Sequence, residues 1–438
     1  MFAFINARIY DYNRYLESGF IVFNQSIIEV GCMSEYVNRG YQELDLTGKL
    51  VLPGFVCGHT HLYSTFARGI SLRFNPNNFL DILHQMWWKI DHFLDLDAVF
   101  YSAVMGGMNQ LKLGTTTLID HHASGKILGS LEMVKKAIND VLKMRGIFAF
   151  ETSDRFNLID CINENLDFIN KNHNRFSSGL FGMHASLSLS DESLKEISNA
   201  LNSNGIHIHV AESEMDETEC EKRYGMRVVE RLEKFNLINS KSLLVHCTHI
   251  TEHEMEIIKK HDATIAVNVT SNLNNAVGIS QIKKFLDKGI RVISGNDGLM
   301  QSMPNELMYI YYLSHLKTKS PTGFSLDDLL KIIKNNYDYV STLLGVSLGQ
   351  FDLGFEADFV ISNYHPYTRM DESNAFSHIF FGVYPGFQPE EVYIGGKKLI
   401  ENYKFIENFE DFYTSSNKKS EELWSIIKKE GEKLEFTD

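Results

Sequence analysis

The sequence predicts an α/β protein, a (β/α)8 TIM barrel with a small β-sandwich domain built from both chain termini. The middle of the chain, 53–349, alternates short apolar runs with stretches of helical periodicity, as is typical of βα units around a parallel sheet. Counting the run that begins at Val51, eight such apolar runs can be distinguished. Further strand-like segments stand at both ends of the chain, outside this alternating region.

The two ends of the chain predict one discontinuous β-domain. Strand-like runs separated by turn residues occupy 4–10, 19–23 and 26–31, and similar runs return at 357–362 and 391–400. Because strands from the two ends can pair on either side of an inserted domain, we expect 1–52 and 350–405 to fold together. The remaining segment, 406–438, is polar with apolar residues at helical spacing, so we expect a helical tail that packs on the rest.

The eight predicted barrel strands end in polar side chains. The first runs from Val51 to His61, and the others lie at 116–120, 146–150, 180–184, 206–210, 242–246, 264–268 and 291–297. In a (β/α)8 barrel, functional side chains stand at the carboxyl ends of the strands. We therefore expect the residues at these ends to form one site.

Composition excludes several classes of partner. The chain has 438 residues and a formal net charge of −14, so no broad basic face is available for nucleic acid or an anionic membrane. A small molecule is the expected partner. The five cysteines show no Cys-x-x-Cys spacing, and no signal-like leader or long apolar run occurs. We expect a cytoplasmic protein, and we expect it to be a homodimer.

Histidine and aspartate residues at four strand ends indicate a metal site. His59 and His61 are two residues apart, so a strand presents both imidazoles to the same side. His209, His246 and Asp297 end three later strands. Three of these four imidazoles together with the carboxylate suit a catalytic Zn²⁺ or Fe²⁺ ion that keeps one position open for water. Such an ion lowers the pKa of water to about 7, and a proton carrier is then needed; Glu212 follows His209 by three residues.

At these motifs the chain resembles the amidohydrolase superfamily, in particular its deaminase and chlorohydrolase branch. The resemblance spans nearly the whole chain and rests on Pro53-Gly54, His59-x-His61, Arg68-Gly69, His209-Val-Ala-Glu212, His246-Cys-x-His249, Ser271-Asn272, Asn296-Asp297-Gly298 and Leu353-Gly-Phe-Glu-Ala-Asp358. Two positions depart from the usual pattern. Val269 replaces the proline before the Ser-Asn motif, and Asn296 replaces the threonine before Asp297.

The resemblance implies a role for each matching residue. His59, His61, His209 and Asp297 would bind a single divalent metal ion, with Zn²⁺ expected and Fe²⁺ as the alternative. The catalytic residues would be Glu212 as proton shuttle, His246 as the group that orients the attacking hydroxide, and Asp297 as the base that takes a proton from water. Branches with two metal ions carry a lysine at the end of the fourth strand of their pattern, and this chain has Phe-Glu-Thr at 150–152. We therefore expect one metal ion.

Three further residues are candidates for substrate binding. His184 ends a predicted strand and faces the same rim. His121 and His122 follow another strand, and we take His122 as the one that reaches the pocket. Trp88 lies in the segment after the first strand, which often covers the barrel mouth in the resembling family, and its indole could stack on a flat ring. His207, which alternates with His209, is expected to point away from the metal ion.

These residues favour a metal-dependent hydrolase, most readily an aminohydrolase that deaminates a purine, pyrimidine or pterin type of heterocycle and releases ammonia. Hydrolysis of another C–N or C–Cl bond, in an imine, a cyclic amide or a chlorotriazine, would use the same residues and is the alternative. A non-catalytic barrel that acts as a scaffold or ligand sensor is the alternative of another class. It predicts that at least one of the metal-binding residues is missing, and all of them are present.

Overall fold

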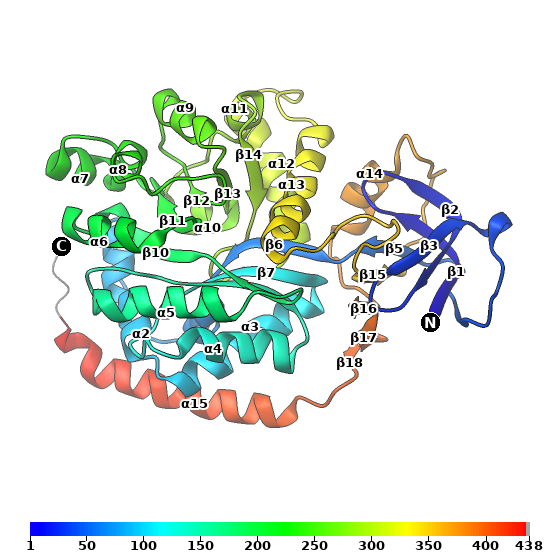
Figure 1. Ribbon diagram of the computed structural model, residues 1–438, viewed down its shortest axis with the longest axis horizontal. Coiled ribbons are helices and arrows are strands. Elements are labelled where there is room, and N and C mark those ends of the chain that lie inside the picture. The colour runs from blue at the N-terminus through cyan, green and yellow to red at the C-terminus, as the bar shows by residue number, and fades with distance from the viewer. Residues whose placement is uncertain (435–438) are drawn as a thin grey trace.

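The computed structural model describes residues 1–434, which form a smaller part built from both ends of the chain and a larger part made of parallel strands and helices. The two parts lie side by side, and the long C-terminal helix runs along the larger one (Figure 1). Within the described residues, no helix is long and apolar enough to cross a membrane.

Strands from the two ends of the chain pair in one mixed sheet. Its order is β18-β17-β16-β15-β5-β1-β2-β3, with β4 added on β1. The two ends meet where β5 pairs with β15 in antiparallel register, Leu52 opposite Val360. The strands are β1 (Phe2–Tyr10), β2 (Tyr15–Phe23), β3 (Ile27–Cys32), β4 (Gln42–Asp45), β5 (Leu50–Pro53), β15 (Phe359–Ser362), β16 (Glu391–Ile394), β17 (Lys397–Glu401) and β18 (Lys404–Phe405).

The segment 391–400 forms a hairpin, whereas the sequence interpretation treated it as one strand. Gly395 and Gly396 have φ values of 54° and 71°, so the chain reverses between β16 and β17. Two consecutive residues with positive φ are the signature of a type I′ turn, for which glycine is favoured. A Cβ at position 396 would lie 1.8 Å from the carbonyl oxygen of Asn24, so only glycine fits there.

The larger part contains eight parallel strands in a TIM-barrel-like arrangement. They are β6 (Phe55–Thr60), β7 (Thr115–His122), β8 (Arg145–Phe150), β10 (Phe181–Ala185), β11 (Ile206–Val210), β12 (Leu243–His246), β13 (Thr264–Val267) and β14 (Arg291–Ser294), with the short β9 (Ser177–Gly179) also on β8. Neighbours pair in parallel within two sheets, β6-β7-β8-β9 and β10-β11-β12-β13-β14. Parallel bridges between Thr60 and Asp297 and between Thr152 and Met183 connect the ends of these sheets.

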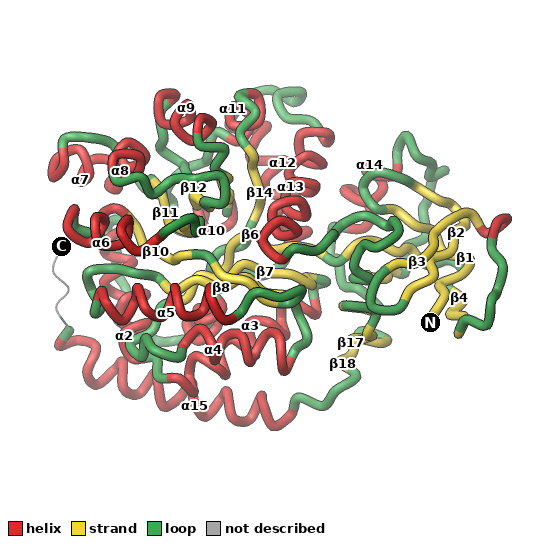
Figure 2. Tube along the Cα trace, in the orientation of Figure 1, coloured by secondary structure: helices red, strands yellow, loops and turns green. Residues whose placement is uncertain are grey.

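The helices lie around these strands, except for the short α14, which lies beside the mixed sheet (Figure 2). They are α1 (Phe79–Ile82), α2 (Trp88–Phe93), α3 (Leu96–Lys112), α4 (Ser130–Lys135), α5 (Leu158–Lys171), α6 (Asp191–Leu201), α7 (Glu214–Tyr224), α8 (Val228–Lys234), α9 (Glu252–Lys260), α10 (Val269–Asn274), α11 (Ile282–Asp287), α12 (Met303–Thr318), α13 (Leu326–Leu344), α14 (Ala375–His378) and α15 (Glu410–Glu430). Short 3-10 or π turns are η1 (Met33–Glu35), η2 (Leu62–Ala67), η3 (Leu83–Trp87), η4 (Lys136–Val141), η5 (Ser186–Ser188), η6 (Ile379–Val383) and η7 (Gly431–Lys433).

The expected first barrel strand is in fact two strands that belong to different sheets. The break lies at Gly54, after which the chain leaves the mixed sheet and enters the barrel-like part as β6. A Cβ at position 54 would lie 2.2 Å from Cγ2 of Thr116, so a side chain would collide with β7. The Pro-Gly pair therefore marks the passage from one sheet to the other.

Helix α13 supports the seam between β14 and β6. The Asn336 side chain accepts a hydrogen bond from the Ser294 amide (2.8 Å) and donates to the carbonyl oxygens of Val56 (2.9 Å) and Ser294 (3.1 Å). Asn336 is buried, so its amide satisfies backbone groups that would otherwise lack partners. The start of β6 and the end of β14 are thereby held to the same helix, which fixes the two strands next to each other.

Candidate active site

Imidazoles and one carboxylate converge at the carboxyl ends of β6, β11 and β14. Oδ1 of Asp297 lies 3.2 Å from Nε2 of His59 and 3.0 Å from Nε2 of His61. Nε2 of His61 in turn lies 3.2 Å from Nε2 of His209. These four expected metal ligands are all buried or nearly so. The structure therefore brings the four side chains together.

The hydrogen bonds behind these rings make the set suitable for a cation. Nδ1 of His61 donates to the carbonyl oxygen of His121 (2.6 Å), and Nδ1 of His209 donates to that of His184 (3.0 Å). In the neutral rings, each Nε2 then carries a lone pair that points into the site. Two lone pairs 3.2 Å apart beside a carboxylate require a positive charge between them, which a divalent metal ion supplies.

Without an ion, a proton meets the same requirement. Burial alone would lower the pKa of His61, but the hydrogen bond and the charge of Asp297 raise it to about 9. Burial also opposes ionisation of Asp297, yet its hydrogen bonds to His59 and His61 hold its pKa well below the usual value. Both shifts reflect a site that stabilises a cation next to an ionised Asp297.

The backbone fixes Asp297 in an uncommon conformation. Its φ is 58°, in the left-handed region that aspartate adopts more readily than most residues. The Asp297 amide donates to the carbonyl oxygen of His59 (3.0 Å), and the Asp297 carbonyl oxygen accepts from the amide of His61 and the hydroxyl of Thr60 (both 2.9 Å). Contacts with the end of β6 therefore aim the Asp297 carboxylate at the two histidines.

His246 and Glu212 stand beside this set. Nδ1 of His246 lies 2.8 Å from Oδ1 of Asn272, and its Nε2 lies 3.3 Å from Oε2 of Glu212 and 3.8 Å from Oδ2 of Asp297. Asn275 donates a hydrogen bond to the other Glu212 oxygen (3.2 Å). Burial and the neighbouring carboxylates raise the pKa of Glu212 well above its usual value. Glu212 is therefore suited to hold a proton at neutral pH and to give it up.

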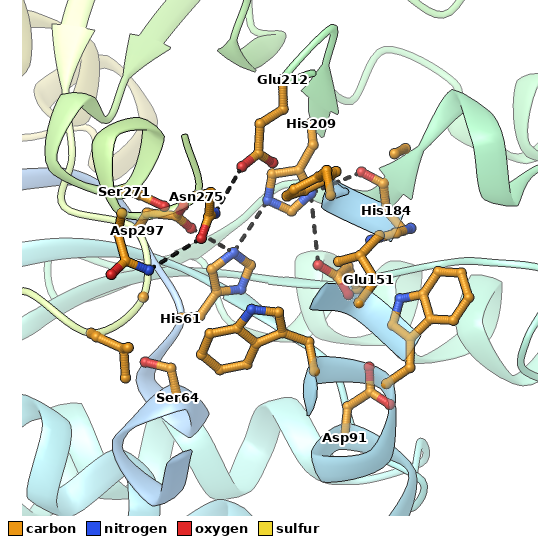
Figure 3. Close-up of a pocket in the computed structure, with 18 of the residues that line it drawn as sticks. His61, Ser64, Asp91, Glu151, His184, His209, Glu212, Ser271, Asn275 and Asp297 are labelled. Atoms are coloured by element: carbon orange, nitrogen blue, oxygen red, sulfur yellow. Dashed lines mark hydrogen bonds and ion pairs between the residues drawn. The ribbon is translucent and has the colours of Figure 1, made fainter. Parts of the chain in front are cut away.

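A cavity of about 190 Å³ opens onto these residues (Figure 3). In the close-up, Glu212 and His209 stand on one side of it, and Ser64 and Asp91 stand on the opposite side. Its described lining residues are His61, Tyr63, Ser64, Phe79, Leu83, Trp87, Trp88, Asp91, Glu151, His184, Ala185, Leu187, His209, Glu212, Asp216, Thr270, Ser271, Asn274, Asn275, Asn296, Asp297, Gly298, Leu299 and Met300. Large apolar and aromatic side chains with a few polar groups are typical of a small-molecule site.

Two of the three expected substrate contacts line this cavity. The Trp88 ring lies 5.9 Å from that of His184, and both side chains are buried. Trp87, Leu83 and Phe79 extend the same wall from α1 and η3. Trp88 and His184 thus stay candidates for substrate binding.

His122 is not among the described lining residues, and the expectation that it faces the cavity is corrected. Strand β7 continues to His122, two residues beyond the expected end, so His121 and His122 point to opposite faces. The His121 ring stacks on that of His207 at 4.3 Å inside the barrel-like part. Nε2 of His122 lies 3.0 Å from the Ser124 hydroxyl instead.

Several residues of the site were not singled out from the sequence. Asp91, on α2, forms two hydrogen bonds with Arg155, and burial raises its pKa to about 6. Glu151 follows β8, and burial raises its pKa to about 7. Ser64 lies in η2 directly after the His-x-His pair. Asp91 and Ser64 belong to segments without a regular spacing signal, so only the folded loops reveal their position.

Other groups of side chains also have metal-ligand geometry. One combines His59, His209 and Asp297 with His246, and a second combines His59, His61 and His209 with His121. A third consists of Glu151, His184 and His209. His209 belongs to all three groups.

A family model, described as the amidohydrolase family, matches residues 50–399. A 5′-deoxyadenosine deaminase of Methanocaldococcus jannaschii is 24% identical over 422 residues, covering 93% of this chain and 96% of the relative. A 5-methylthioadenosine/S-adenosylhomocysteine deaminase 2 of Archaeoglobus fulgidus is 30% identical over 274 residues, which cover 61% of this chain and 63% of that relative.

Solved structures show the same fold. An adenosine deaminase from Xanthomonas campestris with bound zinc superposes with a TM-score of 0.84 at 16% identity, covering 97% of this chain and 98% of that one. The zinc complex of the atrazine chlorohydrolase TrzN from Arthrobacter aurescens gives 0.80 at 20% identity, with coverage of 97% and 100%. With the family match, these findings define the class: the chain belongs to the amidohydrolase family. It is a hydrolytic enzyme that acts on carbon–nitrogen bonds.

Proposed function

We propose that this protein is a metal-dependent aminohydrolase that deaminates an aminated heterocycle of purine, pyrimidine or pterin type. The observation that carries the proposal is the contact of His246 with Glu212 and Asp297, two carboxyl groups that line a cavity of suitable size and polarity. Relatives of this chain bear the names of deaminases that act on adenosine derivatives. An adenine-type ring is therefore the first substrate to examine.

The metal-binding residues of the proposal are His59, His61, His209 and Asp297, holding one Zn²⁺ ion. When bound, such an ion lowers the pKa of a water molecule, so that hydroxide is available at neutral pH. Asp297 accepts the proton that the water loses. His246 orients the nucleophile through its Nε2, because Asn272 fixes the opposite side of the ring.

Glu212 carries the proton that the reaction moves onto the substrate. It protonates the ring nitrogen next to the carbon that bears the amino group, and hydroxide adds to that carbon. Asp297 passes the proton that it took from water to the amino nitrogen, the carbon–nitrogen bond breaks, and ammonia leaves. The proton of the added hydroxyl group goes to Glu212, so both carboxyl groups return to their starting states. The net reaction consumes one water and replaces the amino group by an oxygen.

The finer structural expectations also stay proposals. They are a closed (β/α)8 barrel over 53–349, a small β-sandwich domain from 1–52 and 350–405, and a helical tail over 406–438, of which 435–438 lie outside the described residues. A homodimer and a cytoplasmic location belong with them. Details around Tyr224 and Asn274 resemble the SsnA subgroup of aminohydrolases, and this resemblance is likewise a prediction.

The variant Glu212→Gln tests the proposed role of Glu212. We expect it to keep its metal content, because Glu212 is not one of the proposed ligands, and to lose ammonia release by at least ~10²-fold, a typical contribution of general acid–base catalysis. Metal content by elemental analysis and ammonia release are measured on the same sample. Near-normal turnover with normal metal content would remove Glu212 from the mechanism.

The alternative is hydrolysis of another C–N bond or of a C–Cl bond, because the same residues could serve a different leaving group. The fold shared with a chlorohydrolase gives it a structural precedent. Chloride release from a chlorotriazine without ammonia release from aminated rings would favour it.

A further inference from the structure

Acidic groups line the cavity, and fixed cations do not. Among the described lining residues are the carboxyl groups of Asp91, Glu151, Glu212, Asp216 and Asp297, whereas none of these lining residues is lysine or arginine. The proposed metal ion would be balanced locally by Asp297 and hydroxide. A substrate therefore meets a wall that offers carboxyl groups and neutral polar groups.

The nearest cationic side chain is already engaged. Nη1 of Arg155 bonds to both oxygens of Asp91 (3.1 and 3.0 Å), and its Nη2 lies 3.8 Å from Oε2 of Glu151. The guanidinium also stacks on Trp88, with its carbon 4.6 Å from the ring centroid. Asp91 lines the cavity, whereas Arg155 is absent from its described lining, so the charge of Arg155 is balanced by Asp91.

Neutral polar groups that have no partner among the described residues also line the cavity. The hydroxyl of Ser64, which Figure 3 shows opposite Glu212, is buried and has no hydrogen-bond partner in the described protein. The carboxamide of Asn296 is 1% exposed, and both its oxygen and its nitrogen also lack partners there. A substrate with uncharged hydrogen-bond donors and acceptors would bind favourably here, because it would pair these buried groups.

We propose that the cavity selects an uncharged or cationic heterocycle or nucleoside and rejects analogues that carry a phosphate or a carboxylate. This inference rests on the proposed deaminase function and names its substrate class. Moving an anionic substituent from water into this cavity is unfavourable, because no lysine or arginine among the described lining residues can pair with it and carboxylates are its neighbours. Asp91 matters here because its carboxylate neutralises Arg155, so the pair offers an anion no net positive charge.

The first test compares adenosine with adenosine 5′-monophosphate on the wild-type enzyme. We expect kcat/KM for the nucleotide to be lower by about 10²-fold, since a like-charge contact in a desolvated site is strongly unfavourable. Equal kcat/KM values for both would overturn the inference while leaving the deaminase function intact. If neither releases ammonia, the same comparison is made with whichever uncharged aminated heterocycle is turned over and its carboxylated analogue.

A binding measurement separates selectivity from turnover. Inosine and inosine 5′-monophosphate are deaminated products that cannot react further, and calorimetric titration gives their affinities directly. We expect weaker binding of the phosphorylated product by a similar factor. Tighter binding of the monophosphate would reveal a cationic subsite and would contradict the inference, whatever the catalytic result.

A pair of variants locates the effect. Asp91→Asn removes one carboxylate from the wall and leaves Arg155 without this partner. We expect the ratio of kcat/KM for adenosine to kcat/KM for adenosine 5′-monophosphate to fall about tenfold. Asp154→Asn is the matched control, because Asp154 bonds to Ser190 and Ser193 and is absent from the described lining of the cavity. Equal narrowing in both variants would show a general effect of net charge and would overturn the role given to the cavity wall.

Discussion

His207 lies two residues before His209 on the same face of β11, is buried in the interior and contacts His59 there. The expectation that His207 points away is thereby corrected. Nε2 of His207 lies 2.8 Å from Nδ1 of His59, and burial holds the pKa of His207 well below its usual value, so the ring is neutral. For Nε2 of His59 to bind a metal ion, Nδ1 must carry the proton and donate it to His207. His207 is thus a positioning residue for a proposed ligand.

Replacing His207 tests this arrangement. We expect His207→Phe to lower metal affinity by roughly 10–100-fold, as loss of such supporting contacts does in other metal sites. Competition with a chromogenic chelator measures the affinity. His122→Phe is the control, because that histidine is equally buried but bonds to Ser124. The same loss of affinity in both variants would point to general damage to the fold.

At the scale of elements, the C-terminal helix α15 holds the loop that carries part of the cavity wall. The Trp424 indole donates to the carbonyl oxygen of Phe66 in η2 (2.7 Å), and Lys419 pairs with Asp95 (2.7 Å) at the start of α3. Segment η2 also contains Tyr63 and Ser64, which line the cavity. The last helix of the chain therefore contributes to the shape of the site without entering it.

Trp424→Phe removes this hydrogen bond and keeps most of the packing. We expect KM to rise about fivefold with a smaller change in kcat, which corresponds to one ordinary hydrogen bond of about 1 kcal/mol. Ile426→Ala, on the exposed side of the same helix, is the control and is expected to leave KM unchanged. A fall in kcat alone after Trp424→Phe would contradict the idea that the loop shapes substrate binding.

At the scale of the whole molecule, a buried ion cluster joins the two parts of the protein. Arg145, at the start of β8, donates to Asp358 (2.8 Å) and Glu356 (2.7 Å), which precede β15 in the mixed sheet. Arg175 adds a further contact to Glu356, and Gly395 donates its amide to Asp358 (2.7 Å). The Leu353–Asp358 motif thus matters for this junction.

Arg145→Ala would leave the buried Asp358 without its ion-pair partner and Glu356 with Arg175 alone. We expect the free energy of unfolding to fall by about 3–5 kcal/mol, as when one member of a buried pair is removed. Arg39→Ala, which breaks the exposed pair with Glu29, should cost at most ~1 kcal/mol. Denaturant titration measures both. Similar small losses would show that the junction does not depend on the cluster.

The sequence predicts most of this architecture because it depends on periodicity. Period-two alternation places His59 and His61 together, and strand ends place His209 and Asp297 beside them, so the proposed ligands were found without coordinates. Boundaries were harder, since nothing in the apolar run at 51–61 shows that Gly54 separates two sheets. Strand β7 likewise extends two residues beyond its expected end, so neither His121 nor His122 is among the described lining residues of the cavity.

The cavity wall was the least predictable part. Asp91 and Ser64 lie in segments whose course is set by packing against α15 and β7, and these contacts are distant in sequence. The lack of lysine and arginine in the wall is a property of the assembled site, and no single motif encodes it. Function at this level follows from loops positioned by the scaffold.

Metal content and ammonia release, measured together on protein purified without chelators, test the central claim most directly. The proposed mechanism requires about one zinc ion per chain and ammonia from an uncharged aminated purine, pyrimidine or pterin, with both lost on treatment with a chelator and restored by zinc. Protein that holds no metal ion and releases no ammonia from any of these rings would contradict it.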